Sequence, residues 1–436
     1  MEGHRDLGTI RTDDIEVTSS GLDLFTPPPV DVVLQEGKTV QLSPINTSGD
    51  NGPFEFIISK DVDHFIYLPM TRLEGCIEVL KEDGSSVKEE DQITVVNLFA
   101  QTIFKQVEVE VNGTQVADIS SSTYPYKAFI ETKLSYGRDA KNSHLQVEGW
   151  VDDNLDYINH VDDYASGDAV RHKLIEQKFY FSNVVHVDFF QIERYLLPNI
   201  QVKIKFLKNA DNFTLFTIVD NCKIKVTDLK LNIRKIRIAP EWHATIERNL
   251  AQEPAIYPFT QNKINTFLIP AGYKSFNYQN IVDGNLPKTL IIGFLHTNAY
   301  NGDHHVNSFW FNHYGLNYLN LKVNGMPFYP TPLTPDYGNK KYSREFRLLY
   351  DNIGTHHSNL CVDVSFAEFE ANTNFYAFDF TPDLNNSARL HQTKSGHIDV
   401  DLGFGGDLTH GIYMVVYYSM KQVMLIDSTR KVTLLE

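Results

Sequence analysis

The chain of 436 residues carries 55 acidic and 39 basic side chains, for a net charge of −16, and is 42% hydrophobic and 12% aromatic. This length accommodates two or three domains, and the abundant aliphatic and aromatic residues exclude an intrinsically disordered chain. The acidic balance disfavours sequence-independent nucleic-acid binding, and no apolar run approaches the roughly 20 residues of a membrane-spanning helix.

The N-terminal residues 1–30 are expected to form an extended arm. Residues 1–17 are polar and show no apolar segment typical of a secretory signal. Leu22–Phe25 is followed by three prolines, Pro27–Pro29, which favour an extended conformation that cannot join a sheet interior. We expect the first part of this arm to be weakly ordered in an isolated molecule.

From residue 31 onwards, apolar and polar residues alternate with a period of two. This alternation is typical of strands with one face toward a core and the other toward water. Clear examples are residues 107–111, 202–206, 319–323 and 398–404. The segments between these strands contain the turn-forming residues Asn, Gly, Pro and Asp, a pattern that indicates β-sandwiches.

Two features interrupt or supplement the alternation. Between Ile224 and Ile238 the apolar positions change phase twice, which predicts β-bulges or bends. Helical patterns are few, and the best are Lys127–Ser135, after Pro125, and Tyr342–Tyr350.

The longest insertions between predicted strands are residues 138–172 and 332–374. We expect them near the tops of the sandwiches (the lobes of the molecule) or at contacts between these lobes.

The two halves of the chain share a faint internal repeat. Val111-Asn112-Gly113 and Val323-Asn324-Gly325, 212 residues apart, each end an alternating strand with an Asn-Gly pair, a strong hairpin signal. Residues 199–206 resemble residues 397–404, with Val202 and Ile398 196 residues apart. We therefore predict one β-sandwich plan used twice, over residues 31–240 and 263–436, with a proline-containing linker at 241–262.

The search for catalytic and metal-binding patterns finds little. The three cysteines, Cys76, Cys222 and Cys361, are far apart and odd in number, which indicates buried thiols in a reducing compartment. Nucleophile elbows, phosphate loops and dinucleotide fingerprints are missing from the sequence, and no pair of carboxylates is singled out for glycoside hydrolysis. We predict neither an enzyme nor a cofactor.

Two clusters of potential metal ligands are interpreted as solvated loops. A cupin-like metal site needs His-x-His, whereas the sequence offers only the adjacent pairs His304-His305 and His356-His357, with Asp303 as a possible third ligand. The acidic segment lacks the spacing of a calcium loop. Its members are Asp152, Asp153, Asp156, Asp162, Asp163 and Asp168. We predict no metal.

One stretch, residues 203–237, is locally basic. Its side chains are either a solvated sheet face or a contact for an acidic neighbour, which would be another copy of the chain or packaged nucleic acid. The candidate contact residues are Lys203, Lys205, Lys223, Lys225, Lys230 and Arg234.

Several stretches resemble the double jelly-roll major capsid proteins of Polinton (Maverick) elements and adinto-like viruses. They extend from residue 22 to about residue 384, and their order and combination carry the resemblance. The stretches are LDLFTPPP (22–29), NGPFEF (51–56), VEVEVNG (107–113), TYPYKAFIETKLSYG (123–137), FLIPAG (267–272), LPKTLIIGFLHTNAYNG (286–302) and FYAFDFTPDL (375–384). The acidic loop at 152–168 matches no part of this family.

The resemblance implies an all-β fold of two consecutive eight-stranded jelly rolls with a few short helices. It also implies a homotrimeric, pseudo-hexagonal capsomer that tiles an icosahedral shell around double-stranded DNA, assembled inside the host cell. Partners would be neighbouring capsomers and minor or penton capsid proteins, with at most weak direct contact with nucleic acid. Two alternatives stay open: a double-sandwich enzyme of cupin or glycosidase type, and a trimeric, lectin-like binding module.

Overall fold

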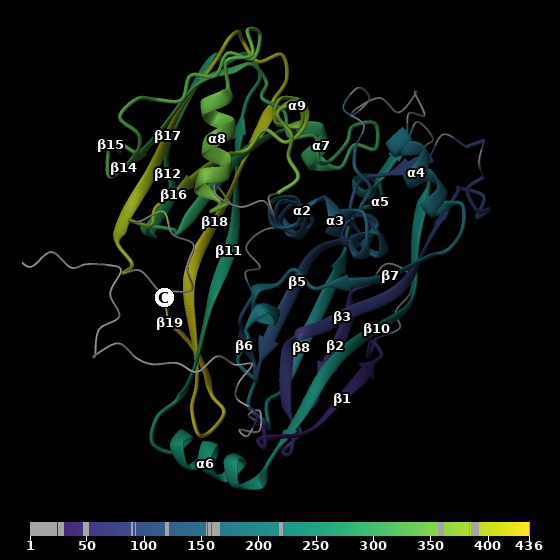
Figure 1. The fold of residues 1–436 in the computed structure, drawn as a ribbon. Coiled ribbons are helices and arrows are strands. Elements are labelled where there is room, and N and C mark those ends of the chain that lie inside the picture. The colour runs from purple at the N-terminus through teal and green to yellow at the C-terminus, as the bar shows by residue number, and fades with distance from the viewer. Residues whose placement is uncertain are drawn as a thin grey trace, which may run out of the picture.

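The computed structural model describes residues 24, 30–46, 52–88, 90–91, 93–117, 122–153, 155, 158, 166–217, 221–355, 362–382, 384 and 392–435. Two β-sandwiches lie side by side, and short helices fill the space between them (Figure 1). The expected N-terminal arm falls outside the described residues, except for Leu24 and Val30.

The first sandwich contains eight strands in two antiparallel sheets, ordered β1-β10-β3-β7 and β2-β8-β5-β6. These strands are β1 (Leu34–Leu42), β2 (Phe54–Ile58), β3 (Phe65–Leu80), β5 (Phe104–Val111), β6 (Thr114–Gln115), β7 (Phe179–Val184), β8 (Val202–Lys208) and β10 (Lys223–Ile238). A further pair, β4 (Ile93–Val95) and β9 (Leu215–Thr217), forms a small separate sheet. The core between the two large sheets is aliphatic and aromatic.

The second sandwich repeats this order, with sheets β11-β18-β13-β16 and β12-β17-β14-β15. Its strands are β11 (Ala255–Ile269), β12 (Ser275–Asn285), β13 (Thr289–His296), β14 (Leu316–Val323), β15 (Met326–Pro327), β16 (Tyr376–Asp379), β17 (Ser395–Phe404) and β18 (Ile412–Ile426); β19 (Val432–Leu435) adds to β18. Counted along the chain, each sandwich has sheets ordered 1-8-3-6 and 2-7-4-5, the jelly-roll arrangement. The predicted double jelly roll is confirmed.

The internal repeat extends to individual hydrogen bonds. The backbone N–H of Asn112 donates to the Gln201 carbonyl over 2.9 Å, and its side-chain oxygen accepts from the Gln201 N–H over 2.9 Å. Asn324 forms the same two bonds with His397, each at 3.0 Å. These two pairs of residues are offset by the spacings, 212 and 196, that the sequence repeat shows.

The long strand β10 accommodates the phase changes seen in the sequence. Its pairing with β3 shifts register between Thr227 and Lys230 and again between Asn232 and Arg234. Asp228, at the first shift, has a φ of 54°. The predicted bulges are confirmed, and they let apolar residues on both sides of each shift face the same core.

Eleven short helical segments connect the strands of the described chain. They are α1 (Phe99–Thr102), α2 (Tyr124–Ser135), α3 (Arg138–Lys141), η2 (His144–Glu148), α4 (Ser166–Ile175), η3 (Asp188–Gln191), α5 (Asp211–Thr214), α6 (Pro240–Leu250), α7 (Thr297–Asn301), α8 (Ser343–Asn352) and α9 (Phe366–Ala371). The two helices predicted from the sequence correspond to α2 and α8. Pro125 lies in the first turn of α2, where its missing N–H costs no hydrogen bond.

The predicted linker at 241–262 differs from the structure. It contains most of α6 and the first half of β11, whose residues from Ala255 onwards pair with β18. Pro258 pairs opposite Val423 within this ladder, and β11 is an edge strand, a position that tolerates proline because only one side joins the sheet. We propose that α6, at the base of the molecule in Figure 1, connects the two sandwiches.

In the sheet β11-β18-β13-β16, strand β13 and most of β18 are buried on both faces. Leu290, Ile292 and Phe294 of β13 point into the core of the second sandwich, whereas Ile291 and Leu295 point toward the first sandwich. The apolar runs of β13 and β18 therefore lack the usual polar positions, as expected for a strand covered on both sides. This sheet joins the two sandwiches into one packed body.

Gly293 shows how closely this sheet is packed. A Cβ atom at this position would lie 2.8 Å from a ring carbon of Phe311 and 2.9 Å from ring carbons of Phe375. We expect Gly293→Ala to lower the free energy of unfolding by about 1–3 kcal/mol, because overpacking forces the two rings apart. Gly406→Ala is the matched control, since a Cβ there meets nothing within 4 Å. Equal denaturant midpoints for the two variants would contradict this account.

Candidate functional site

An aromatic cluster fills the seam between the two sandwiches. Phe129 of α2 stacks on Phe309 with ring centroids 4.4 Å apart, and Tyr126 stacks on Tyr300 at 5.5 Å. Trp150, which is 1% exposed, completes the side contributed by the first sandwich. The two insertions expected at lobe tops or inter-lobe contacts both contribute to this seam, through η2 and its neighbours in the first half and α8 and α9 in the second.

Ion pairs link α2 and the first insertion to the second insertion. The Lys133 ammonium lies 2.6 Å from the Glu368 carboxylate, and the Arg138 guanidinium lies 3.1 Å from the Asp363 carboxylate. The Lys141 ammonium lies 5.2 Å from the centre of the Trp150 ring, a cation–π contact. Burial, together with the neighbouring Lys133, lowers the pKa of Lys141 to about 8.

A second, largely buried ionic cluster lies beside the aromatic one. The Lys127 ammonium contacts the carboxylates of Glu131, at 2.6 Å, and Asp188, at 2.8 Å. The other Glu131 oxygen lies 2.7 Å from Nδ1 of His186. Lys127 and Glu131 are one turn apart on α2, so the helix itself places them on one face.

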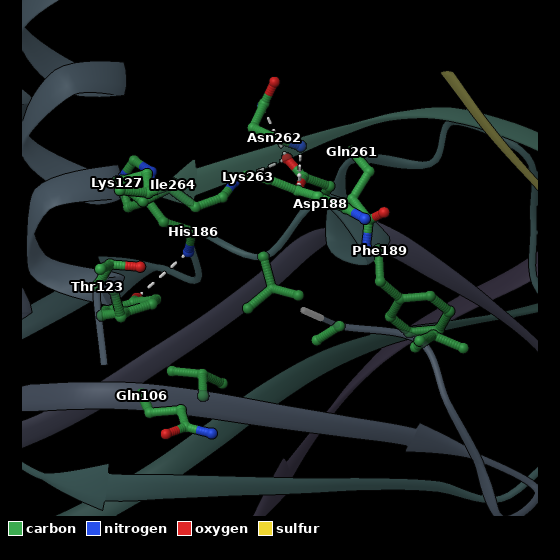
Figure 2. A pocket seen from close by; sticks show the side chains of 15 residues that line it. Gln106, Thr123, Lys127, His186, Asp188, Phe189, Gln261, Asn262, Lys263 and Ile264 are labelled. Atoms are coloured by element: carbon green, nitrogen blue, oxygen red, sulfur yellow. Dashed lines mark hydrogen bonds and ion pairs between the residues drawn. The ribbon is translucent and has the colours of Figure 1, made fainter. Parts of the chain in front are cut away.

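The second sandwich completes this ionic cluster. Figure 2 shows Asn262 of β11 facing Asp188, and its side-chain amide donates to Asp188 over 2.9 Å and to Glu131 over 3.1 Å. The backbone N–H of Asn262 donates to the second Asp188 oxygen over 2.9 Å. The hydroxyl of Tyr417 also donates to Glu131, over 3.3 Å. The charges of one sandwich are therefore satisfied partly by groups of the other.

Opposing effects set the proton affinities in this ionic cluster. Burial alone would raise the pKa of Glu131, but Lys127 and His186 outweigh burial and lower it to about 2. Burial raises the pKa of Asp188, although Lys127 opposes that rise. Burial would lower the pKa of Lys127, yet its two carboxylate partners raise it. The Lys127–Glu131 pair is thus held in its charged form.

The ionic cluster is built for structure rather than for substrate chemistry. Two cavities adjoin the cluster, one of about 50 Å³ and one of about 220 Å³ that Glu131 and Tyr417 line, and both are smaller than a ligand pocket of about 300–1,000 Å³. Every charged group already has a close partner within the cluster. The arrangement can orient two sandwiches against each other.

The six basic candidates do not form one patch. Lys203 and Lys205 lie on β8, whereas Lys223, Lys225, Lys230 and Arg234 lie on β10, in the opposite sheet of the first sandwich. Lys203 approaches Glu55 at 3.9 Å, and Lys205 approaches Glu108 at 3.3 Å, across strands. The two groups are separate because β8 and β10 enter different sheets of the sandwich, and whether either group contacts an acidic partner stays a prediction.

The structure places both predicted Asn-Gly turns and one of the two histidine pairs. Asn112-Gly113 and Asn324-Gly325 form the β5–β6 and β14–β15 turns, and all four residues have positive φ. The ligand-type atoms of Asp303, His304 and His305 lie within 4.8 Å of one another on the surface. The pair at 356–357 falls outside the described residues, so a joint site with it is untested.

The acidic segment is only partly a solvated loop. Asp153 forms a buried ion pair with Arg171, at 2.7 Å, and accepts a hydrogen bond from Asn372 of the second sandwich. The prediction of a purely solvated loop is therefore wrong for Asp153, because the fold brings an arginine from α4 over it. Residues 156, 162 and 163 fall outside the described part, as does the side chain of residue 168.

The prediction of buried cysteines is confirmed where the structure describes them, and the reducing compartment stays a prediction. Cys76 is a buried, free thiol, and Cys222 is buried. The third cysteine, at position 361, lies outside the described residues. Within the described part of the chain, no helix has the length and apolar character needed to cross a lipid bilayer.

Comparison with known proteins shows the fold and a distant relative. No family model matches the sequence. An uncharacterized protein of Caenorhabditis elegans is 22% identical over 419 residues, which cover 92% of this chain and 98% of that protein. At this level of identity, the relative alone does not assign a family.

Three solved structures are similar along nearly the whole chain. The Sputnik virophage structure has a TM-score of 0.63 at 10% identity, covering 98% of this chain and 94% of that one. VP54 of PBCV-1 has a TM-score of 0.60 at 12% identity, covering 94% and 99%. The major capsid protein of mavirus has a TM-score of 0.54 at 10% identity, covering 100% and 95%. These neighbours are double jelly-roll major capsid proteins, and this chain has their fold.

Removing the Lys127 ammonium from the buried ionic cluster should strongly destabilise the folded chain. Lys127→Met leaves Glu131 and Asp188 buried without their shared partner, and we expect a loss of about 3–5 kcal/mol in the free energy of unfolding. Lys88→Met is the matched control, because the Lys88–Glu90 pair, at 3.9 Å, is largely exposed and such pairs contribute about 0–1 kcal/mol. Similar losses in both variants, measured by urea unfolding, would argue against a structural role for the cluster.

The lowered pKa of Glu131 predicts a pH dependence. Its folded value of about 2 lies below the unfolded value of 4.5, so its stabilisation is present above pH 4.5 and is lost as the pH falls toward 2. The size of this effect is up to about 3 kcal/mol, and the raised pKa of Asp188 offsets part of it. Urea midpoints between pH 7 and 3 should fall less for Glu131→Gln than for the unaltered chain. Glu110→Gln, on an outward position of β5, should retain the unaltered slope.

Proposed function

We propose that this chain is a major capsid protein, with a structural rather than a catalytic role. The observation that carries this proposal is the duplicated 1-8-3-6 and 2-7-4-5 strand order, in a chain whose fold is similar over nearly its whole length to a solved major capsid protein. The ionic cluster at the seam supports it, because its bonds to Asn262 fix one sandwich against the other.

We further propose that three copies form a pseudo-hexagonal capsomer. Two similar sandwiches in each chain place six similar lobes around a threefold axis, which suits a six-coordinated position in an icosahedral lattice. The doubly buried sheet supports this arrangement, since it holds the two lobes of each chain at one fixed angle. Neighbouring capsomers and minor or penton proteins would be the partners, in a shell assembled inside the host cell.

The proposal extends to the kind of genome enclosed. The resemblance to Polinton (Maverick) and adinto-like capsid proteins implies double-stranded DNA, and the relative in an animal is consistent with an element carried in an animal genome. The net charge of −16 and the cross-strand pairing of Lys203 and Lys205 disfavour strong direct contact with that DNA.

The mass in solution tests the assembly. Size-exclusion chromatography with light scattering should give three times the chain mass of 49.9 kDa, and negative-stain images of that peak should show six-lobed blocks or shells. A chain that stays monomeric across a range of salt concentrations and pH would contradict the capsomer. Metal analysis and glycan binding would then test the enzyme and lectin alternatives.

A further inference from the structure

A large groove opens on the second sandwich, away from the seam. It measures about 660 Å³ and lies between the β12–β13 loop, the β14–β15 hairpin, the end of β16 and part of β18. Its apolar lining includes Met326, Phe328, Phe380 and Met420, and Met326 is 71% exposed. A volume of this size is typical of ligand and peptide sites. We call it the β15 groove.

Two side-chain oxygen atoms in the β15 groove have no hydrogen-bond partner in the described part of the chain, although the other Asp379 oxygen accepts from the Thr381 N–H over 2.8 Å. Asp379 and Thr381 are 2% and 6% exposed, and both line the groove. Asp379 Oδ2 and the Thr381 hydroxyl have no hydrogen-bond partner among the described residues. Buried polar groups are almost always hydrogen-bonded, so these two indicate that a donor comes from a bound molecule.

Two lysines give the β15 groove a positive rim. Lys288 and Lys421 both line it, and no ion pair to either is present in the described part of the chain. Burial, and then the charge of Lys288, lowers the pKa of Lys421. Such a like-charged pair favours an anionic partner. The groove thus combines apolar surface, unpaired acceptors and cations, which suits an acidic, apolar peptide.

The N-terminal segment of the chain has this chemistry. Residues 1–29 contain six acidic and two basic residues, and they end in Asp23-Leu24-Phe25-Thr26 followed by three prolines. Proline-rich segments bind aromatic-lined grooves at low entropic cost, because they are already extended. The side chains of Leu24, Val30 and Val32 are 75%, 76% and 72% exposed in the single chain, so these three apolar side chains lack a covering surface.

We propose that the β15 groove binds the N-terminal segment of a neighbouring copy within the same oligomer, around residues 22–29. A neighbour is the occupant because β1, to which the segment leads, and β15 lie at opposite corners of the molecule (Figure 1). The segment supplies backbone N–H donors to Asp379 and Thr381, and its one acidic residue, Asp23, faces Lys288 and Lys421. The inference rests on the proposed oligomer.

Cysteine cross-linking between two differently tagged, full-length copies tests this inference. One copy carries Leu24→Cys and the other Met326→Cys, and both carry Cys361→Ser; the remaining cysteines are buried. Because a disulfide needs Cβ atoms within about 4.5 Å, mild oxidation should join the two tags only if the segment lies in the groove. Met70→Cys, on β3 and 51% exposed, replaces Met326→Cys in the matched control.

We expect several-fold more intermolecular product with Met326→Cys than with Met70→Cys. Lys421→Glu should lower that yield several-fold, and Asp23→Lys on the other copy should restore it. Equal yields for the two cysteine positions would overturn the inference, and so would a disulfide formed only within one chain that carries both cysteines.

Light scattering on the same samples separates this inference from the proposed function. A trimer without the specific cross-link overturns the occupant of the groove and leaves the capsomer intact. A monomer overturns both the capsomer and the neighbour as occupant.

Discussion

The sheet β11-β18-β13-β16, covered on both faces, is the constraint on which the rest of the molecule depends. One face closes the second jelly roll, and the other packs on α2, η2 and the aromatic cluster at the seam. Strand β18 reaches farther, because Met424 and Ile426 at its end join the core of the first jelly roll. A single strand therefore contacts all three apolar clusters, and neither sandwich can rotate without exposing apolar surface to water.

The buried ionic cluster fixes the relative orientation of the two sandwiches, which apolar contact alone leaves less defined. Apolar packing tolerates small rotations, whereas Asn262 and Tyr417 can satisfy Glu131 and Asp188 only at one relative position of the two sandwiches. Ion pairs of this kind contribute less to stability than to a unique arrangement, since desolvation offsets much of their attraction. The cluster therefore fixes the angle between the two sandwiches, which the proposed capsomer requires.

The two halves of the chain share a strand order but differ in the segments inserted between their strands. Both halves keep the eight-stranded order and the same Asn-Gly turn, with two equivalent hydrogen bonds. The insertions of both halves meet at the seam, whereas the β15 groove occurs on the side of the second half that faces away from it. The two insertions therefore join the sandwiches within one chain, and the β15 groove takes no part in that contact.

The sequence by itself determined the strands, the turns and the repeat, because alternation, Asn-Gly pairs and bulge-type phase changes act over a few residues. It also contained a signal for the doubly buried sheet, in the unbroken apolar runs at 290–295 and 412–418. Only the tertiary structure decided which polar residues meet. Lys127 and Asp188, or Asp153 and Arg171, pair because separate loops converge, and the basic residues of β8 and β10 separate because the two strands enter opposite sheets. Such contacts depend on how distant segments of the chain pack together, which a local sequence pattern does not predict.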